Sequence, residues 1–129
     1  MSDNIIEFQQ INMAFGKKEI LNDVSFAVQK GETLAVIGPS GSGKSTILRL
    51  LIGLLEPTGG KILINGQDVS LFDEDHWNSL RQKMGMVFQY SALFDFLSVG
   101  ENVAFGLRQH TELSEAEIQK VVAERLEQV

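Results

Sequence analysis

The spacing of apolar and polar residues in the first third of the chain predicts short strands. Residues 5–12 and 24–28 alternate apolar and polar positions imperfectly, as half-exposed antiparallel strands do. Residues 33–38 contain a continuous apolar run, which is typical of a strand buried on both faces. Turns are predicted at Gly16 and at residues 29–32. We therefore expect a small antiparallel sheet followed by a buried strand.

The next part of the chain switches to helical spacing. Apolar residues surround most of residues 44–55, so we expect a largely buried helix there, ended by the proline and glycines of residues 56–60. Residues 61–65 then read as a strand and residues 66–68 as a turn. Residues 73–80 begin with acidic side chains that suit a helix N-terminus.

The second half is predicted to be mostly helical after one more strand, at residues 84–89. Residues 98–107 predict a short helix that is interrupted or ended by glycine. Ser114 and Glu117 have the spacing of a capping box, and helical periodicity follows them to the last residue.

Composition narrows the class of protein. The chain has 129 residues, of which 43% are hydrophobic and 22% charged, and this favours one ordinary globular domain. It has no cysteine, no apolar run of membrane-spanning length and no signal-peptide pattern at its start, so we expect it in the cytoplasm.

The charge is unevenly distributed. Residues 1–65 carry six basic and six acidic side chains, and residues 66–129 carry five basic and eleven acidic ones, so the net charge of −6 lies in the second half. This argues against a broad surface for polyanions, and we expect no nucleic-acid partner. Any binding of a nucleotide must come from local geometry.

One short segment has that geometry. Its letters, GPSGSGKST, match the phosphate-binding pattern G-x-x-x-x-G-K-[ST], with an apolar strand pattern before it and an apolar helix pattern after it. The candidate nucleotide-binding residues in it are Gly38, Pro39, Ser40, Gly41, Ser42, Gly43, Lys44, Ser45 and Thr46.

Each residue type in this segment has a chemical role. Glycines let the backbone curl so that successive N–H groups point at phosphate oxygens, and the following helix adds its positive end. Lys44 is expected to reach the β- and γ-phosphates, the Ser45 hydroxyl to ligate Mg²⁺, and Thr46 to bond the α-phosphate. The expected cofactors are ATP and Mg²⁺.

Beyond this loop, the chain resembles the ATP-binding cassette (ABC) ATPases over essentially its whole length. Residues 13–32 are similar to the opening of that family, where an aromatic ring stacks on adenine, and Phe15 occupies that place. Residues 84–89 look like the strand that leads into the family's Q-loop. The resemblance implies that Gln89 contacts Mg²⁺ and the attacking water. Residues 56–70 are similar to a structural signature of the family.

The resemblance also implies partners. Residues 90–107 are unusually apolar, and in this family such a segment receives a coupling helix of a membrane permease; the candidate contact residues are Leu93, Phe94, Phe96 and Leu97. The letters SALF followed by ENVAFGL are similar to the ATPases of lipid-trafficking, Mla-type importers. We expect the protein on the inner face of the membrane, working as a head-to-tail dimer in its complete form.

The fold implied is α/β, a P-loop NTPase with a RecA-like core and an N-terminal antiparallel β subdomain, truncated within one ABC ATPase domain. Residues 1 to about 90 would form the ATP-binding part, and residues from about 91 to 129 would form the Q-loop region and the start of a helical subdomain. The family's LSGGQ signature, Walker B carboxylates and switch histidine do not occur in these residues. We therefore expect this chain alone to bind ATP weakly, if at all, and not to hydrolyse it, with Lys44 and Gln89 as its only catalytic candidates.

Other classes of function remain open from the residues. A GTPase would need an NKxD-type guanine reader, which does not occur, and a small-molecule kinase would need an arginine-rich lid. A non-hydrolysing nucleotide-binding or regulatory module fits the same residues, and so does an ABC ATPase that does not transport.

Overall fold

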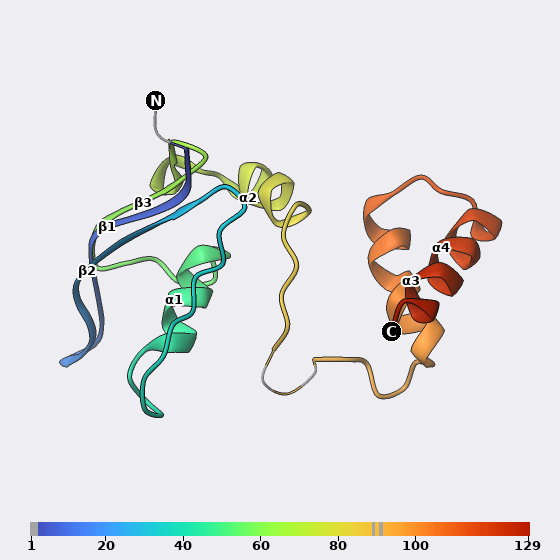
Figure 1. The fold of residues 1–129 in the computed structure, drawn as a ribbon, viewed down its shortest axis with the longest axis horizontal. Helices are drawn as coiled ribbons and strands as arrows, with labels where there is room; N and C mark the ends of the chain where they lie inside the picture. The colour runs from blue at the N-terminus through green and yellow to red at the C-terminus, as the bar shows by residue number, and fades with distance from the viewer. Residues whose placement is uncertain (1–2, 89, 91) are drawn as a thin grey trace. The chain divides into compact units, whose positions relative to one another are not determined.

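The computed structural model describes residues 3–88, 90 and 92–129. The described chain divides into two compact units, residues 1–81 and residues 82–129. The first contains a four-stranded sheet, two α-helices and the short 3₁₀ helix η1 (Val69–Leu71), and the second contains a pair of α-helices (Figure 1). Strands and helices thus occur together, as expected for the α/β class.

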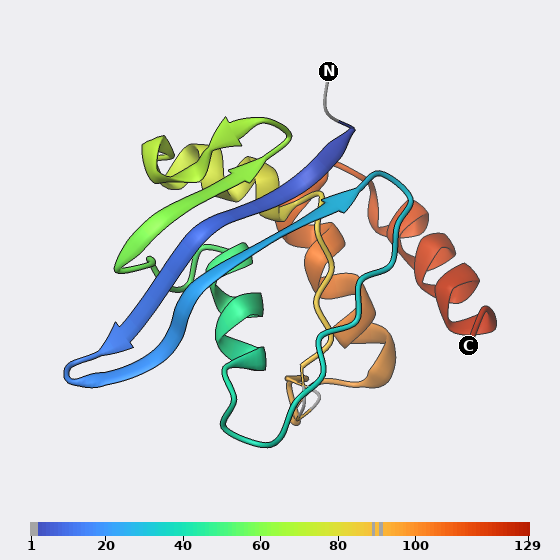
Figure 2. The same ribbon diagram turned by 60° about the vertical axis from the view of Figure 1, so that its left-hand side comes forward.

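The sheet in the first unit is antiparallel throughout, with strand order β2-β1-β3-β4. β1 (Asn4–Phe15) and β2 (Lys18–Gln29) form a long hairpin, and β3 (Gly59–Ile64) pairs with the other edge of β1. Figure 2 shows these three strands side by side. β4 (Gln67–Asp68) is a short strand that pairs with β3. The prediction of antiparallel strands is confirmed, although β1 and β2 are longer than the patterns indicated.

The core of this unit lies between the sheet and α1 (Lys44–Leu51). Phe8 in β1 stands opposite Phe26 in β2, with ring centroids 4.5 Å apart, and opposite Ile62 in β3. The buried apolar side chains are Phe8, Ile11, Met13, Leu21, Ile47, Leu50, Ile62, Ile64 and Val69. Burial of this size is the main stabilising contribution in a small unit.

A close approach of two backbones explains one glycine of the segment at residues 56–70. Gly60 has φ +88°, and a Cβ atom there would lie 2.3 Å from the backbone oxygen of Gln10. Only glycine fits such an approach. The turn predicted at residues 66–68 is instead formed by Asn65 and Gly66, because Gln67 and Asp68 pair with β3.

The end of α1 differs from the prediction. The helix ends at Leu51 rather than near residue 55, and it buries one face instead of most of its surface; Leu48 is 47% exposed. Arg81, the last residue of α2 (Glu74–Arg81), donates hydrogen bonds to the carbonyl oxygens of Ile52 and Gly53 just beyond α1. Its guanidinium also lies over the ring of Trp77, 5.3 Å from the centroid.

Two predicted strands are not formed. Residues 33–38 are exposed and unpaired, with Ile37 at 90% exposure, and residues 84–88 are also without strand pairing. An apolar run supplies only the preference for an extended backbone, whereas a strand also needs a neighbour for its N–H and C=O groups. Among the described residues, no segment pairs with either run.

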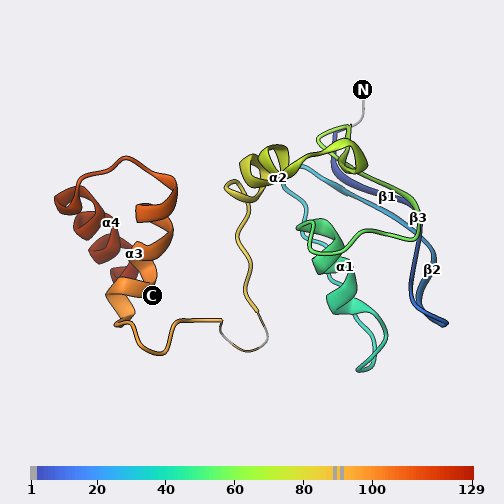
Figure 3. The same ribbon diagram turned by 180° about the vertical axis from the view of Figure 1, so that it is seen from behind.

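The second unit is a helix pair. α3 (Val99–His110) and α4 (Glu115–Glu127) pack through Ala104, Ile118 and Val122, and the loop that joins them is visible from behind (Figure 3). α3 continues through Gly106, so the predicted glycine interruption is wrong; the glycine costs only part of the helix stability that packing supplies.

The capping box predicted for the last helix is confirmed. Ser114 Oγ accepts from the Glu117 backbone N–H, and the Glu117 carboxylate accepts from the Ser114 N–H. No helix in the described part of the chain is long and apolar enough to cross a membrane.

Candidate functional site

The glycine-rich segment is fixed to the sheet at its end. Gly43, which precedes α1, has φ +99°, and a Cβ atom there would lie 2.9 Å from Leu21 Cδ2 and 3.1 Å from Ile20 Cγ2. Both contacts belong to β2, so the start of α1 sits directly on this strand. The absence of a side chain at Gly43 allows the close contact.

The backbone before Gly43 curls back on itself. The Ser42 N–H donates to the Pro39 carbonyl oxygen at 3.2 Å, and Gly41 has φ +81°. A Cβ atom on Gly38 would lie 2.7 Å from Ser42 Oγ, which shows how closely the two ends of the loop approach. The curled backbone is the geometry that an anion-binding nest requires.

Lys44 closes this loop from the first position of α1. Its Nζ donates to the carbonyl oxygen of Gly38 and, at 2.9 Å, to that of Pro39. Neutral carbonyl groups therefore hold the ammonium, and its charge is not compensated by any salt bridge among the described residues. Such a cation is available to an anion that enters the loop.

The N-terminus of α1 adds to the positive potential. The first N–H groups of a helix have no partner within it, and no acidic side chain lies in the first turn of α1. Ser45 is exposed, so its hydroxyl is accessible, whereas Thr46 is 7% exposed and faces inward. Polar donors and positive charge thus gather at one end of one helix.

Phe15 lies at the end of β1, beside the hairpin turn, and is 48% exposed. The register of the hairpin relates it to the loop. Met13 pairs with Leu21, which touches the Gly43 position, and Phe15 follows Met13 by two residues on β1. An exposed ring face therefore lies on the same hairpin that supports the start of α1.

Two predicted site features are not brought together here. Gln89 lies outside the described residues. Among the residues that the structure describes, no group of three or more His, Cys, Asp or Glu side chains could hold a metal ion. Ser45 is the described candidate for a metal ligand, and Mg²⁺ characteristically takes few protein ligands together with phosphate oxygens.

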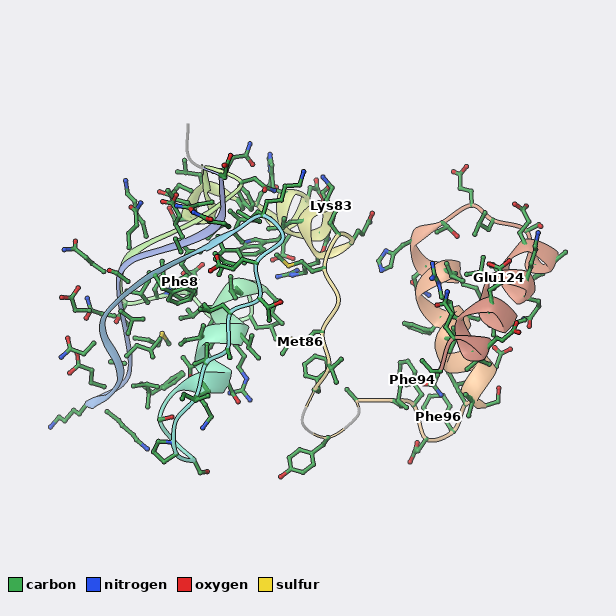
Figure 4. The ribbon with its side chains drawn as sticks, viewed as in Figure 1. Phe8, Lys83, Met86, Phe94, Phe96 and Glu124 are labelled. Carbon is green, nitrogen blue, oxygen red and sulfur yellow. The ribbon has the colours of Figure 1, made fainter. Side chains whose placement is uncertain are left out.

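The predicted partner residues lie on a loop that leads into α3. Leu93 and Phe96 are 69% and 78% exposed, and Phe94 is 39% exposed. Figure 4 labels Phe94 and Phe96 on this loop. The Phe94 ring contacts Phe96 and Phe105, at centroid distances of 5.5 and 4.8 Å. Beside these side chains is a surface hollow of about 580 Å³.

The side-chain amide of Asn102 holds this loop, a role that sequence reasoning missed. Asn102 Oδ1 accepts from the Phe94 N–H at 2.9 Å, and Nδ2 donates to the Phe94 carbonyl oxygen at 3.1 Å. The only signal in the sequence was an asparagine in the first turns of a helix whose N-cap is Ser98, which is a common position for polar residues of no special role.

The glycine-rich loop, the helix that follows it and the supporting hairpin define the class of P-loop nucleotide-binding proteins. The chain belongs to the ABC transporter family, because the sequence model of that family matches residues 21–129. It is 40% identical over 129 residues to the intermembrane phospholipid transport system ATP-binding protein MlaF of Haemophilus influenzae, covering all of this chain and 49% of that protein.

One further relative has a similar sequence, and one solved protein has a similar structure. It is 42% identical over 124 residues to the sulfate/thiosulfate import ATP-binding protein CysA of Pectobacterium atrosepticum, covering 94% of this chain and 36% of that one. Its structure is similar to the ATP-binding cassette MJ0796, solved as a dimer in a post-hydrolysis state bound to ADP and Pi. The TM-score is 0.84 and the identity 30%, over 95% of this chain and 56% of that one. The chain therefore spans about half the length, or less, of these relatives.

Proposed function

We propose that this chain is the N-terminal part of an ABC-type ATPase subunit, which binds Mg-ATP at residues 38–46 and drives a membrane permease. One observation supports this most strongly: Lys44, in the first turn of a helix without acidic residues there, is held only by the carbonyl oxygens of the loop it closes. An entering polyphosphate would offer this ammonium anionic oxygens in place of neutral ones.

The proposed binding reaction is an exchange of partners. Lys44 leaves the Gly38 and Pro39 carbonyl oxygens and bonds the β- and γ-phosphates, while the N–H groups of the loop and of the first turn of α1 point at phosphate oxygens. Ser45 is the candidate ligand of Mg²⁺, and Thr46 the candidate donor to the α-phosphate. Bound Mg²⁺ neutralises charge that develops on the phosphates.

Two more residues complete the proposed nucleotide site. The Phe15 ring stacks on adenine, supported by its exposure and its place on the hairpin under the loop. Gln89 orients the attacking water and contacts Mg²⁺, an assignment that depends on the family resemblance alone. Neither residue is a general base, so this chain by itself does not turn ATP over.

The remainder of the complete protein would supply what these residues lack. It would bring the signature, the Walker B carboxylates and the switch histidine, and it would pair with residues 33–38 and cover the exposed side of α1. Leu34, Ile37 and Leu48 are among the exposed apolar side chains of those segments. Alone, the chain should self-associate through these surfaces.

The partner proposal depends on the surface around Leu93, Phe94, Phe96 and Leu97. From residue 84 to residue 107 the chain has no Lys or Arg, and its two charged residues are Asp95 and Glu101. Glu101 is paired with Arg108, so the acidic side chain of this segment without an ion pair among the described residues is Asp95. An apolar surface with an acidic side chain at its edge is complementary to the cytoplasmic segments of membrane proteins, which carry an excess of Lys and Arg. The proposed occupant is therefore a basic, apolar cytoplasmic helix of a permease, with the protein peripheral on the inner face of the membrane.

The complete protein is further proposed to work as a head-to-tail dimer, with ATP between the phosphate loop of one subunit and the signature of the other. The proposed cargo is lipid, supported by the SALF and ENVAFGL segments and by the likeness to a phospholipid transport ATPase. A sulfate/thiosulfate ATPase is equally similar, so the decisive observation is the permease that the protein engages.

The test compares this chain with the complete protein. Calorimetric titration with ATP, with and without Mg²⁺, is expected to give Mg²⁺-dependent binding by the complete protein and weak binding by the 129-residue chain. Steady-state phosphate release is expected only from the complete protein. Turnover by the 129-residue chain that Lys44→Ala abolishes would contradict the division of labour proposed here.

A further inference from the structure

A single neutral side chain organises the loop that carries the exposed aromatic residues. Besides its two bonds to the backbone of Phe94, the Asn102 Nδ2 group donates to the carbonyl oxygens of Leu97, at 3.3 Å, and Ser98, at 2.9 Å. One amide therefore bonds four backbone groups of residues 94–98, with the two hydrogens of its NH₂ group shared among three carbonyl oxygens.

The position of Asn102 in α3 allows this reach. Ser98 is the N-cap of α3, and its Oγ accepts from the Glu101 N–H at 3.1 Å, so Asn102 begins the second turn. Side chains in a helix lean toward its N-terminus, which directs the amide back over the cap and onto the incoming loop. A helix surface thus serves as a rigid support for an irregular segment.

Phe94 transmits this order to the surface. Its backbone N–H and C=O both bond Asn102, while its ring lies between Phe96 and Phe105, with tilted ring planes. Phe105 projects from α3 itself. Fixing the Phe94 backbone therefore fixes the ring against which Phe96, a 78% exposed aromatic side chain, is placed.

We propose that Asn102 is a positioning residue that preorganises residues 94–98 for docking of the permease helix. The inference rests on the partner proposed above, a basic and apolar cytoplasmic helix, and assigns to Asn102 the task of holding its docking surface in one conformation. Asn102 need not touch the partner. A loop that is already ordered avoids the loss of conformational entropy that would otherwise oppose binding.

The experiment uses the complete protein and the permease with which it co-purifies. Asn102→Ala removes all four bonds and leaves α3 intact, since alanine is the best helix former. We expect faster hydrogen exchange at the Phe94 amide, about tenfold weaker binding to the permease and a matching loss of permease-stimulated hydrolysis. Unstimulated ATP binding should be unchanged. Gln109→Ala, which removes an exposed amide from the same helix, is the matched control and should change none of these.

Asn102→Asp separates positioning from simple removal of the side chain. Aspartate keeps an acceptor for the Phe94 N–H but loses both N–H donors that the three carbonyl oxygens share, and it sets a negative charge beside these oxygens. It should therefore fail to restore docking. If Asn102→Ala does not fold, Asn102→Gln, whose amide lies one methylene too far out, is expected to give the same defects.

The outcomes are distinct from failure of the proposed function. Wild-type protein that engages no permease contradicts the partner itself. If wild-type protein docks, the Asn102 proposal is overturned by Asn102→Ala binding with wild-type affinity, or by Asn102→Asp restoring full docking. Faster exchange at Phe94 without weaker docking also overturns it.

Discussion

Two loops in this molecule are each closed by a polar side chain from the helix that follows, and they differ in what they leave unsatisfied. Lys44 of α1 bonds the carbonyl oxygens of Gly38 and Pro39, and Asn102 of α3 bonds the backbone of residues 94–98. In the first loop a full positive charge faces neutral acceptors. In the second, a neutral amide meets neutral donors and acceptors in nearly complete pairing.

This difference suits the two loops to different proposed roles, binding a ligand for the first loop and holding exposed side chains in place for the second. A cation held by carbonyl groups gains free energy when an anion replaces them, and we propose that the first loop exchanges its own bonds for those of a ligand in this way. An uncharged amide that already bonds four backbone groups has no charge to offer an incoming anion, so it gains little from an exchange of partners. The second loop is therefore proposed to present its side chains to a partner without opening.

Among the variants that test the difference between the two loops, Lys44→Ala should have the largest effect. It removes the cation from the first loop, and we expect ATP affinity of the complete protein to fall by about 100-fold, since charge-assisted bonds to two phosphates are lost. Calorimetric titration measures the change. Lys44→Arg keeps the positive charge, but its planar guanidinium group does not fit the same acceptors, so this variant should also bind ATP weakly.

The matched control is Lys30→Ala, which removes an exposed lysine from the turn after β2. It should leave ATP affinity unchanged. An equal loss from both lysine variants would mean that general charge, and not the closed loop, attracts the nucleotide.

Gly43→Ala tests how firmly the first loop is seated on the sheet. The new Cβ atom would strain a backbone at φ +99° and press on Leu21 and Ile20, so we expect a loss of about 2–4 kcal/mol in the free energy of unfolding. Fluorescence of Trp77, the only tryptophan, follows unfolding of this unit in denaturant.

Gly41→Ala provides the comparison, because Gly41 has φ +81° with open space around its Cβ position. It should cost about 1 kcal/mol, from backbone strain alone. Equal losses from the two variants would show that the contact with β2 contributes nothing.

Phe15→Ala sharpens the account of the first loop as a nucleotide receptor. Removing the ring should weaken ATP binding by about tenfold, because stacking of a base on an aromatic ring contributes about 1–3 kcal/mol. Phe15→Tyr should retain affinity. Leu71→Ala, at an 82% exposed apolar side chain in the same unit, is the control. Affinity for inorganic triphosphate should not respond to Phe15→Ala.

The smallest effect concerns the ion pair that joins α3, the helix after the second loop, to α4. Arg108 bonds both Glu101 and, at 2.9 Å, Glu115, and this partner holds the pKa of the Glu115 carboxyl below its usual value. A depressed carboxyl pKa stabilises the folded state above the unfolded-state pKa, and that contribution is lost as the pH falls through the folded-state value. The helix pair of this unit should therefore be slightly less stable to thermal unfolding in acid than at neutral pH.

Glu115→Gln should lower stability slightly at neutral pH and reduce the acid dependence, as followed by thermal unfolding at pH 7 and pH 3. The Asn102 bonds contain no titratable group, so exchange at the Phe94 amide should respond to pH only through its intrinsic rate. An acid-dependent opening of residues 94–98 that persists in Glu115→Gln would contradict this separation.

The local patterns predicted well where a segment carries its own partners. The β1–β2 hairpin, the capping box at Ser114 and the glycine-rich loop each depend on neighbours close in sequence. The apolar runs at residues 33–38 and 84–88 predicted strands that are not formed, because strand pairing is a property of two segments and periodicity describes one.

The candidate site likewise has features that the sequence predicted and features that only the structure shows. The motif identified the residues around Lys44, but not that β2 side chains support Gly43 or that Lys44 bonds the loop's own carbonyl oxygens. Asn102 could not be assigned, since its four partners follow from how the preceding loop folds back on α3. The roles of Lys44, Ser45, Thr46, Phe15 and Gln89 in binding nucleotide or Mg²⁺ stay predictions.

The central claim is that residues 38–46 hold the phosphates of ATP by exchanging the bonds of Lys44. The most direct measurement is hydrogen exchange of backbone amides in the complete protein, with and without saturating Mg-ATP. We expect strong protection of the amides of residues 41–46 by Mg-ATP, absent with adenosine and absent in Lys44→Ala at the same nucleotide concentration. Protection that is confined to other segments, or that survives intact in Lys44→Ala, would contradict it.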